Sequence, residues 1–344
     1  MSFSISSSYA TLRSIIDATS DETLPSLAAV AAAEASLSTC LPGDGLGEAA
    51  TEAHLLHDLT PGFNGPKTSA NFYGFVTGGV FPIAEVADHI VTAYDQNVQV
   101  HLPDQTICTT VEDRALSMLL ELLDLDVHQW KGRTFTTGAT GANLLGLACG
   151  RESIVNARLR NLGRGRHADG VGKLGLLGAC LAAGVQAIQV LTTMGHSSLY
   201  KAASIVGLGR GCVKDIPVSK EQPWRLDIEQ LETELKKSGD GILSIVAISA
   251  GEVNTGNFAV NGVEEMKKVR SLCDQYGAWL HVDGGTLNPL LQYERETNIK
   301  SEAFGIFARS LPKTSEFSSL VTTASGLELA DSIAGDCHKM LNVV

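Results

Sequence analysis

Short apolar runs alternate with longer stretches of helical spacing from about residue 132 onward. Runs of roughly four to eight apolar residues are typical of buried strands, and apolar residues three or four apart are typical of amphipathic helices. Strands are predicted over residues 133–137, 187–193, 212–218, 242–248 and 278–282, and helices over 142–159, 198–206, 228–237 and 263–276. Because nearly continuous apolar strands alternate with helices, we expect an α/β fold with a mostly parallel central sheet covered by helices on both faces.

The chain before residue 132 shows helical rather than strand-like patterning. Helices are predicted over residues 9–16, 24–38, 82–94 and 109–123. The segment 69–79 is rich in glycine and aromatic residues and is predicted to be a loop, because it has too many glycines for a helix. We therefore expect residues 1–64 to form an N-terminal helical arm and residues 65–344 to form one large domain.

Composition and charge narrow the classes of protein and partner. The chain is 44% hydrophobic and 19% charged, as in globular proteins. Its net charge of −12, without a long cluster of lysine and arginine, argues against nucleic acid and anionic membrane surfaces as partners. No apolar run reaches the roughly 18 residues of a membrane-spanning helix.

The cysteines and the N-terminus bear on the compartment. The 7 cysteines are scattered and include no C-x-x-C pair, which argues against a disulfide scaffold or a zinc knuckle and favours a reducing compartment. The N-terminus lacks the basic start and apolar core of a secretory signal. We expect a cytoplasmic protein; a mitochondrial presequence is the alternative, because the N-terminus is serine-rich with Arg13 before Asp17.

A lysine near the C-terminus is the first candidate for chemistry. Lys339 lies between apolar residues in the segment 331–344. Such a lysine is expected to be partly desolvated, which favours the neutral amine and lets it bond covalently to a carbonyl cofactor. The alternative is a lysine that extends from a strand end towards solvent.

Three predicted strands end in residues of candidate function. The first leads into the small-residue turn 136–143, where backbone N–H groups, a helix N-terminus and the Thr140 hydroxyl form a seat for an anion, although such turns are common. The second is followed by His196, which suits either a helix cap or a platform for a flat ring. The fifth ends in Asp283, whose carboxylate needs a positive partner if it is buried.

A protonated pyridine nitrogen is one such partner for Asp283, and a metal ion is the alternative. His281 is the nearest second ligand, since alternate strand residues face the same side, but no further ligand stands at metal spacing, and we expect no metal. Because the carboxyl ends of parallel strands share one edge of a sheet, the anion seat, His196 and Asp283 are expected to meet there with Lys339. This set matches a cofactor with a phosphate, an aromatic ring and an aldehyde.

At this point the chain resembles the pyridoxal-phosphate-dependent group II amino-acid decarboxylases, the family of glutamate, aromatic-amino-acid and tyrosine decarboxylases, and the fungal branch in particular. The resemblance extends from about residue 65 to residue 344. It is carried by the segments 72–79, 93–97, 111–115, 137–143, 195–198, 281–284 and 338–339.

The resemblance implies a fold-type I aminotransferase-like large domain, a homodimer, and pyridoxal 5'-phosphate bound covalently to Lys339. It implies that His196 stacks on the pyridine ring and that Asp283 pairs with the ring nitrogen. The phosphate would be held by Gly138, Ala139 and Thr140, with His338 nearby, and the substrate side would be lined by Asn71 and Phe72. The implied reaction is the loss of CO2 from an L-amino acid.

Two departures from the family pattern are expected to matter. Residues 285–302 interrupt the path from the Asp283 strand to the segment 303–312, and we predict that they are an insertion, read from an intron; coding DNA without splice sites at its borders would contradict this. The chain also ends five residues after Lys339, whereas relatives continue into a mobile loop and a small C-terminal domain. We therefore expect a C-terminal truncation, with Val343 and Val344 as a splicing or stop artefact.

The predicted function is a pyridoxal-phosphate-dependent carboxy-lyase that converts an L-amino acid to its amine. The first alternative is a truncated paralogue that binds the cofactor or dimerises without decarboxylase activity. The second is another reaction on the same cofactor, such as oxidative deamination or a lyase cleavage. No position in the sequence decides between acidic and aromatic substrates.

Overall fold

A computed structural model describes residues 4–18, 23–68, 79–163, 170–252, 254–284 and 302–341. The chain divides into two compact units, one formed by Met1–Ala87 with Asn342–Val344 and the other by Asp88–Leu341. The predicted boundary of the helical arm at residue 64 stays a prediction. So does the insertion over 285–302, of which residues 285–301 lie outside the described residues.

The described part of the first unit is helical. It contains α1 (Ile5–Ala18), α2 (Leu27–Ser36), α3 (Glu48–Ala53) with the π-helix η1 (His54–Leu59) and the 3-10 helix η2 (Thr60–Gly62), and the start of α4 (Pro82–Ala93). Helix α2 begins where the Ser26 hydroxyl accepts a hydrogen bond of 3.1 Å from the backbone N–H of Ala29. The predicted helices in this part of the chain are confirmed.

The described part of the second unit is built around a parallel five-stranded sheet in the order β2-β1-β3-β4-β5. The strands are β1 (Ala187–Thr192), β2 (Val213–Asp215), β3 (Ile242–Ser249), β4 (Trp279–Gly284) and β5 (Ser332–Gly335). The predicted parallel α/β sheet is confirmed, as are the four predicted strands that became β1 to β4. No helix in the described residues is long and apolar enough to cross a membrane.

One predicted strand is wrong: residues 133–137 form no strand. The Arg133 side chain is held by Asp113 at 2.7 Å and by the Ser117 hydroxyl at 2.9 Å, both on helix α5 (Cys108–Leu122), and the Phe135 side chain is exposed. The segment therefore runs along α5 to the start of the next helix instead of joining the sheet. The fifth strand of the sheet is β5, which pairs with β4 at the edge of the sheet. It was not predicted, because it is too short for its sequence pattern to stand out.

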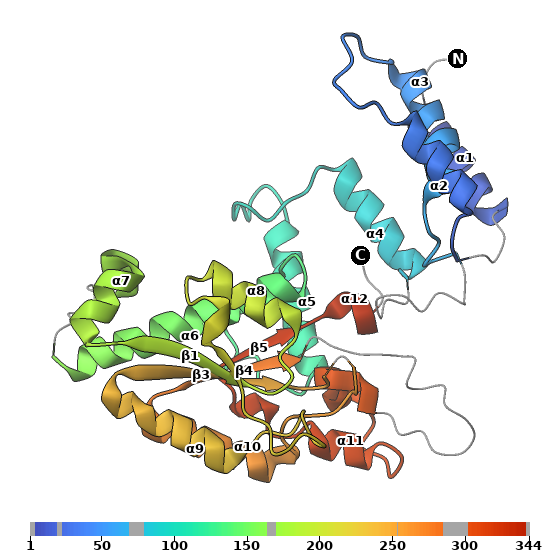
Figure 1. Ribbon diagram of the computed structural model, residues 1–344. Coiled ribbons are helices and arrows are strands. Elements are labelled where there is room, and N and C mark those ends of the chain that lie inside the picture. Colours follow the sequence, from blue (N-terminus) through green and yellow to red (C-terminus); the bar gives the residue numbers. More distant parts are fainter. Residues whose placement is uncertain are drawn as a thin grey trace. The chain divides into compact units, whose positions relative to one another are not determined.

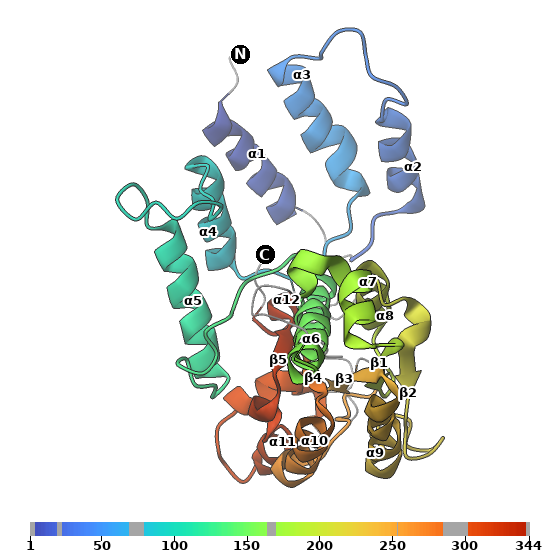
Figure 2. The same cartoon turned by 90° about the vertical axis from the view of Figure 1, so that its left-hand side faces the viewer.

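Helices cover both faces of the sheet (Figures 1 and 2). Alternate residues of β3 point to opposite faces: Ile245 packs in one apolar cluster and Val246 in the other. The first face is covered by α6 (Ala139–Asn161), α7 (Val171–Ala183) and α8 (Ser197–Ile205), and the second by α9 (Ile228–Lys236), α10 (Gly262–Tyr276) and α11 (Ser318–Thr323). Helix α7 was not predicted, because its three glycines weaken the helical pattern.

Candidate functional site

The carboxyl edge of the sheet gathers the predicted site residues. Asp283 lies near the end of β4, and His196 lies between β1 and α8. Residues Asp283 and Gly284 pair with Ala334 and Gly335, so helix α12 (Cys337–Met340) follows β5 at the same edge. This helix carries His338 and Lys339, which the chain therefore brings to the edge where Asp283 lies.

Helix α6 brings its N-terminus to the same edge because it packs closely on β4. A Cβ atom at Gly146 would lie 2.5 Å from His281 Cε1, and one at Gly150 would lie 2.7 Å from Trp279 Cδ1. As the helix advances by one turn, its contact on β4 moves back by two residues, so the helix runs antiparallel to the strand. The start of α6 consequently lies beside Asp283.

The predicted anion seat is the first turn of α6. Gly138 occupies the N-cap position with a φ of 88°, a conformation that favours glycine, and no side chain caps the helix there. The N–H groups at the start of a 23-residue helix are thus free of a side-chain cap, as an anion site requires. The assignment of Gly138, Ala139 and Thr140 to a phosphate stays a prediction.

His196 caps helix α8. Its Nδ1 atom accepts a hydrogen bond of 3.3 Å from the backbone N–H of Ser198 and lies 2.7 Å from the Ser198 hydroxyl. The sequence left a helix cap and a ring platform as alternatives, and the cap is present. Because the cap uses only Nδ1, the half-buried ring face is compatible with the second role as well.

Asp283 is 5% exposed, and its Oδ2 atom accepts a hydrogen bond of 3.1 Å from Asn143 Nδ2. Within the described residues it forms no salt bridge with a lysine, arginine or histidine. A buried carboxylate with an amide donor and no cation fits a ligand that brings a positive group, such as a protonated ring nitrogen.

His281 lies two residues before Asp283 and on the same side of the strand, as predicted. Its ring is fully buried, with Nε2 2.9 Å from Asn143 Oδ1 and Nδ1 2.8 Å from Ser332 Oγ. Burial lowers the pKa of His281, and the nearby Asp283 raises it by less. Both ring nitrogens are engaged, so the residue is a poor metal ligand, and no group of three His, Cys, Asp or Glu side chains in the described residues could hold a metal ion.

Lys339 is mostly buried, as predicted, with a side chain that is 12% exposed. Its Nζ atom lies 2.9 Å from Asp336 Oδ2, and His338 Nδ1 lies 2.6 Å from the other oxygen of the same carboxylate. Asp336 is itself buried and follows β5 directly. The carboxylate therefore holds both basic residues at the sheet edge.

Sequence reasoning missed three polar residues of this site: Asn143, Ser198 and Asp336. The signal for Asn143 was its place on the inner face of α6, in line with the buried Leu147 and Gly150. A polar residue on the buried face of a helix indicates a buried partner. Asp336 could have been found from its position three residues before Lys339, at the N-cap of the same short helix.

The predicted substrate residues Asn71 and Phe72 lie outside the described residues, as do Val343 and Val344.

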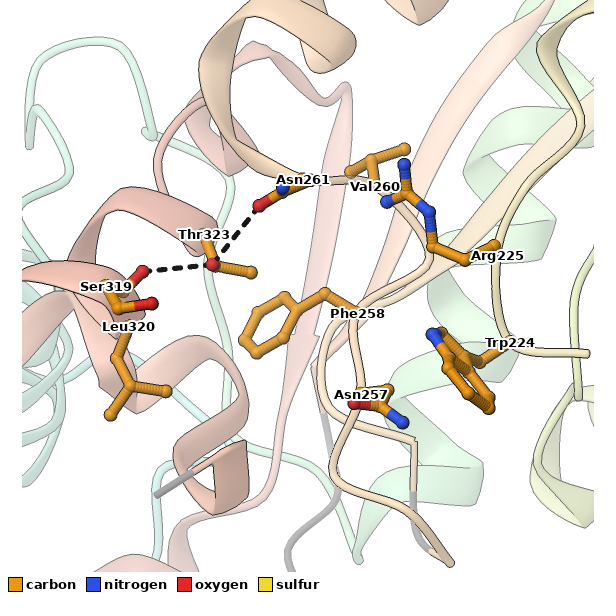
Figure 3. Close-up of a pocket in the computed structure, with 9 residues that line it drawn as sticks. All are labelled: Trp224, Arg225, Asn257, Phe258, Val260, Asn261, Ser319, Leu320 and Thr323. Atoms are coloured by element: carbon orange, nitrogen blue, oxygen red, sulfur yellow. Dashed lines mark hydrogen bonds between the residues drawn. The ribbon is translucent and has the colours of Figure 1, made fainter. Parts of the chain in front are cut away.

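A separate cavity of about 390 Å³ lies between the loops that precede α9 and α10 and helix α11 (Figure 3). None of the predicted site residues lines it. The charge of Arg225 at its rim is paired with Glu265 at 2.7 and 2.8 Å, and the Thr323 hydroxyl donates to Asn261 Oδ1 at 3.3 Å. The charge of Arg225 and the Thr323 hydroxyl are thus already paired.

Comparison with known proteins gives a family for most of the chain. A family model described as the pyridoxal-dependent decarboxylase conserved domain matches residues 67–287 of the 344. This range contains His196 and Asp283 and ends before His338 and Lys339.

Two curated proteins illustrate the similarity in sequence. The L-2,4-diaminobutyrate decarboxylase of Acinetobacter baumannii is 24% identical over 210 residues, which are 60% of this chain and 34% of that protein. The aspartate 1-decarboxylase of Aliivibrio fischeri is 25% identical over 302 residues, which are 84% of this chain and 46% of that protein. The chain thus spans less than half the length of these two relatives.

Solved structures share the fold. Oryza sativa TDC with PLP and tryptamine superposes with a TM-score of 0.65 at 22% identity, covering 98% of this chain and 62% of that one. A second structure is the glutamate decarboxylase domain of a diaminobutyrate-pyruvate transaminase and L-2,4-diaminobutyrate decarboxylase from Vibrio parahaemolyticus. It superposes with a TM-score of 0.65 at 20% identity, covering 99% of this chain and 64% of that one. The predicted fold class is confirmed.

Proposed function

This chain belongs to the pyridoxal-dependent decarboxylase family, and from that premise we propose that the protein catalyses the pyridoxal-phosphate-dependent loss of CO2 from an L-amino acid. The observation that carries the proposal is the buried Asp283 carboxylate, which has an amide donor but no cation among the described residues. It lies at the sheet edge to which the chain also brings His196 and Lys339.

The residues of this edge fit the cofactor group by group. Asp283 would hold the proton on the ring nitrogen, and His196 would pack on the ring face. The first turn of α6, at Gly138, Ala139 and Thr140, would hold the phosphate, and His338 would lie nearby. When bound, pyridoxal phosphate supplies a ring that accepts the electrons of the breaking bond between Cα and the carboxylate.

Lys339 is proposed as the amine that attaches the cofactor. An amine bonds to an aldehyde only in its neutral form, so the ammonium group must first release a proton. We propose Asp336 Oδ2 as the acceptor of that proton, because it lies 2.9 Å from Nζ. Asp336 would then hold the amine in position and retain its proton within hydrogen-bond distance of Nζ.

We propose in addition that the protein is a homodimer in the cytoplasm. Large apolar side chains of the first unit are exposed, among them Leu27, Leu41 and Ile83, and a second copy would cover such side chains. The cysteines in the described residues are free thiols, which supports a reducing compartment. Sedimentation of the purified protein tests the dimer, and a monomer would contradict it.

The decisive experiment loads the purified protein with pyridoxal phosphate, records its visible absorption, and measures CO2 release from L-aspartate, L-2,4-diaminobutyrate and L-tyrosine. These substrates are chosen from the names of relatives. We expect Lys339→Ala to lose the absorption of covalently bound cofactor. Lys313→Ala is the matched control, because the Lys313 side chain is 75% exposed and should leave the absorption unchanged.

Wild-type protein that shows no cofactor absorption would refute the proposed function. Cofactor absorption without CO2 release from any L-amino acid would favour the alternative of a paralogue that binds the cofactor without decarboxylating. Cofactor absorption of undiminished strength in Lys339→Ala would show that a different amine carries the cofactor.

A further inference from the structure

The Asn143 amide lies at the junction of the candidate site. Its Nδ2 atom is 3.1 Å from Asp283 Oδ2 and 2.9 Å from Ser198 Oγ, and its Oδ1 atom is 2.9 Å from His281 Nε2. The side chain is fully buried. It thus connects helix α6 with strand β4 and with the residue that contacts His196.

The carboxylate fixes the orientation of this amide. An ionised aspartate only accepts hydrogen bonds, so the Asn143 NH2 group must face Asp283. The amide oxygen must then face His281 and needs a donor there. The Nε2 atom of His281 therefore carries the proton, and Nδ1 is an acceptor.

The other end of the network is compatible with the same assignment. The indole Nε1–H of Trp279 can only donate, and it donates to Ser332 Oγ at 2.9 Å. The Ser332 hydroxyl proton is then available for His281 Nδ1, which lies 2.8 Å away. Burial, which lowers the pKa of His281, is consistent with a neutral ring with a single proton.

The second N–H of the amide sets the protonation of His196. It donates to Ser198 Oγ at 2.9 Å, so the Ser198 hydroxyl directs its own proton to His196 Nδ1 at 2.7 Å. His196 Nδ1 also faces the backbone N–H of Ser198. Two donors at Nδ1 make that nitrogen an acceptor and leave Nε2 as the ring N–H.

We infer that Asn143 is a positioning residue that transmits the negative charge of Asp283 to both histidines and fixes each of them as the tautomer protonated at Nε2. The hydrogen bonds carry the tautomer assignment by themselves, whereas its value for catalysis rests on the proposed function. In that function Asn143 keeps Asp283 oriented towards the ring nitrogen and keeps the His196 ring in one orientation against the ring face.

The test is long-range 1H–15N NMR of the histidine rings, recorded on the protein before and after it is loaded with pyridoxal phosphate. The signals of His196 and His281 are assigned by their absence from the spectra of His196→Gln and His281→Gln. In the wild type we expect both rings to show the pattern of the neutral Nε2–H tautomer. His128, which is exposed, is the internal control and should show a mixture of tautomers.

Three variants separate positioning from packing. In Asn143→Ala both tautomer preferences should weaken, and the cofactor should dissociate faster by up to about tenfold, as expected for loss of a hydrogen bond to a charged group. In Asn143→Asp, which has nearly the same shape, the new carboxylate can accept the Ser198 hydroxyl proton. His196 should then lose its preference for the Nε2–H tautomer. This variant provides the test if the alanine variant does not fold. In Ser332→Ala the His281 tautomer should persist, because Asn143 alone requires it.

A wild-type His281 ring that is protonated at Nδ1 or doubly protonated would overturn the inference. So would a His196 tautomer that stays unchanged in Asn143→Asp. The failure of the proposed function would look different: the tautomers would be as expected, and the protein would bind no pyridoxal phosphate.

Discussion

At the scale of single residues, one buried charge organises the site. Asp283 is a carboxylate whose described partner is an amide, so its charge is available to a cationic ligand group. The same charge orients Asn143 and, through it, His281. Replacement of Asp283 should therefore affect both the proposed chemistry and the surrounding hydrogen bonds.

We expect Asp283→Asn to reduce CO2 release by about 100-fold or more, because the neutral amide no longer holds a proton on the ring nitrogen. Cofactor retention should fall by about tenfold or less, since the phosphate and lysine contacts persist. Steady-state rates and equilibrium dialysis measure the two effects. Asp274→Asn, at a side chain that is 68% exposed, serves as the control, and equal losses in rate and retention would contradict the expected role.

Sequence reasoning found the charged and aromatic candidates but not the amide between them. Asp283 and Lys339 stand out because a charge beside apolar runs is unusual, and both are buried in the structure. Asn143 does not stand out, because a single polar residue near a helix start is common and its partners come from strand β4 and helix α8, far along the chain. Its role depends on packing that no local pattern encodes.

At the scale of elements, helix α6 controls how closely the site is assembled. Its glycines let the helix lie directly on the His281 and Trp279 rings. The strands β1 to β4 could be predicted because buried parallel strands are continuously apolar. Residues 133–137, Arg-Thr-Phe-Thr-Thr, are of strand-favouring residue types, but α5 binds Arg133, and strand pairing is not visible in a local run.

Gly146→Ala should destabilise the protein by about 1–3 kcal/mol, because the added methyl group would meet the His281 ring and the packed interior gives little way. Gly172→Ala is the matched control: it also lies in a helix, but an added methyl group meets nothing within 4 Å, and alanine there should be neutral or stabilising by up to about 1 kcal/mol. Urea unfolding of both variants measures the difference. Equal stability of the two would show that α6 is not packed as described.

At the scale of the whole molecule, the fully buried His281 ring makes stability depend on pH. Its pKa is lower in the folded state than in the unfolded chain, where it is about 6.5. The unfolded chain therefore binds more protons as the pH falls. The free energy of unfolding should be constant above the unfolded-state pKa and decrease as the pH is lowered from about 6.5 through the folded-state value.

Within that window we expect the decrease to approach about 1.4 kcal/mol per pH unit for this one group. Urea unfolding at a series of pH values between about 8 and 5 measures the slope. His281→Gln, although less stable at every pH, should lack this component. A wild-type protein that becomes more stable on acidification in the same range would contradict a neutral buried ring.

The packing of α6 on β4 and β5 also constrains how related sequences can diverge. An imidazole N–H at His281 needs the Asn143 oxygen as its acceptor, and the Ser332 hydroxyl serves the same ring from the neighbouring strand. A homologue that replaces the amide by an aliphatic side chain would leave that N–H without an acceptor. Substitutions at these three positions should accordingly be inherited together, as covarying changes in an alignment of the family.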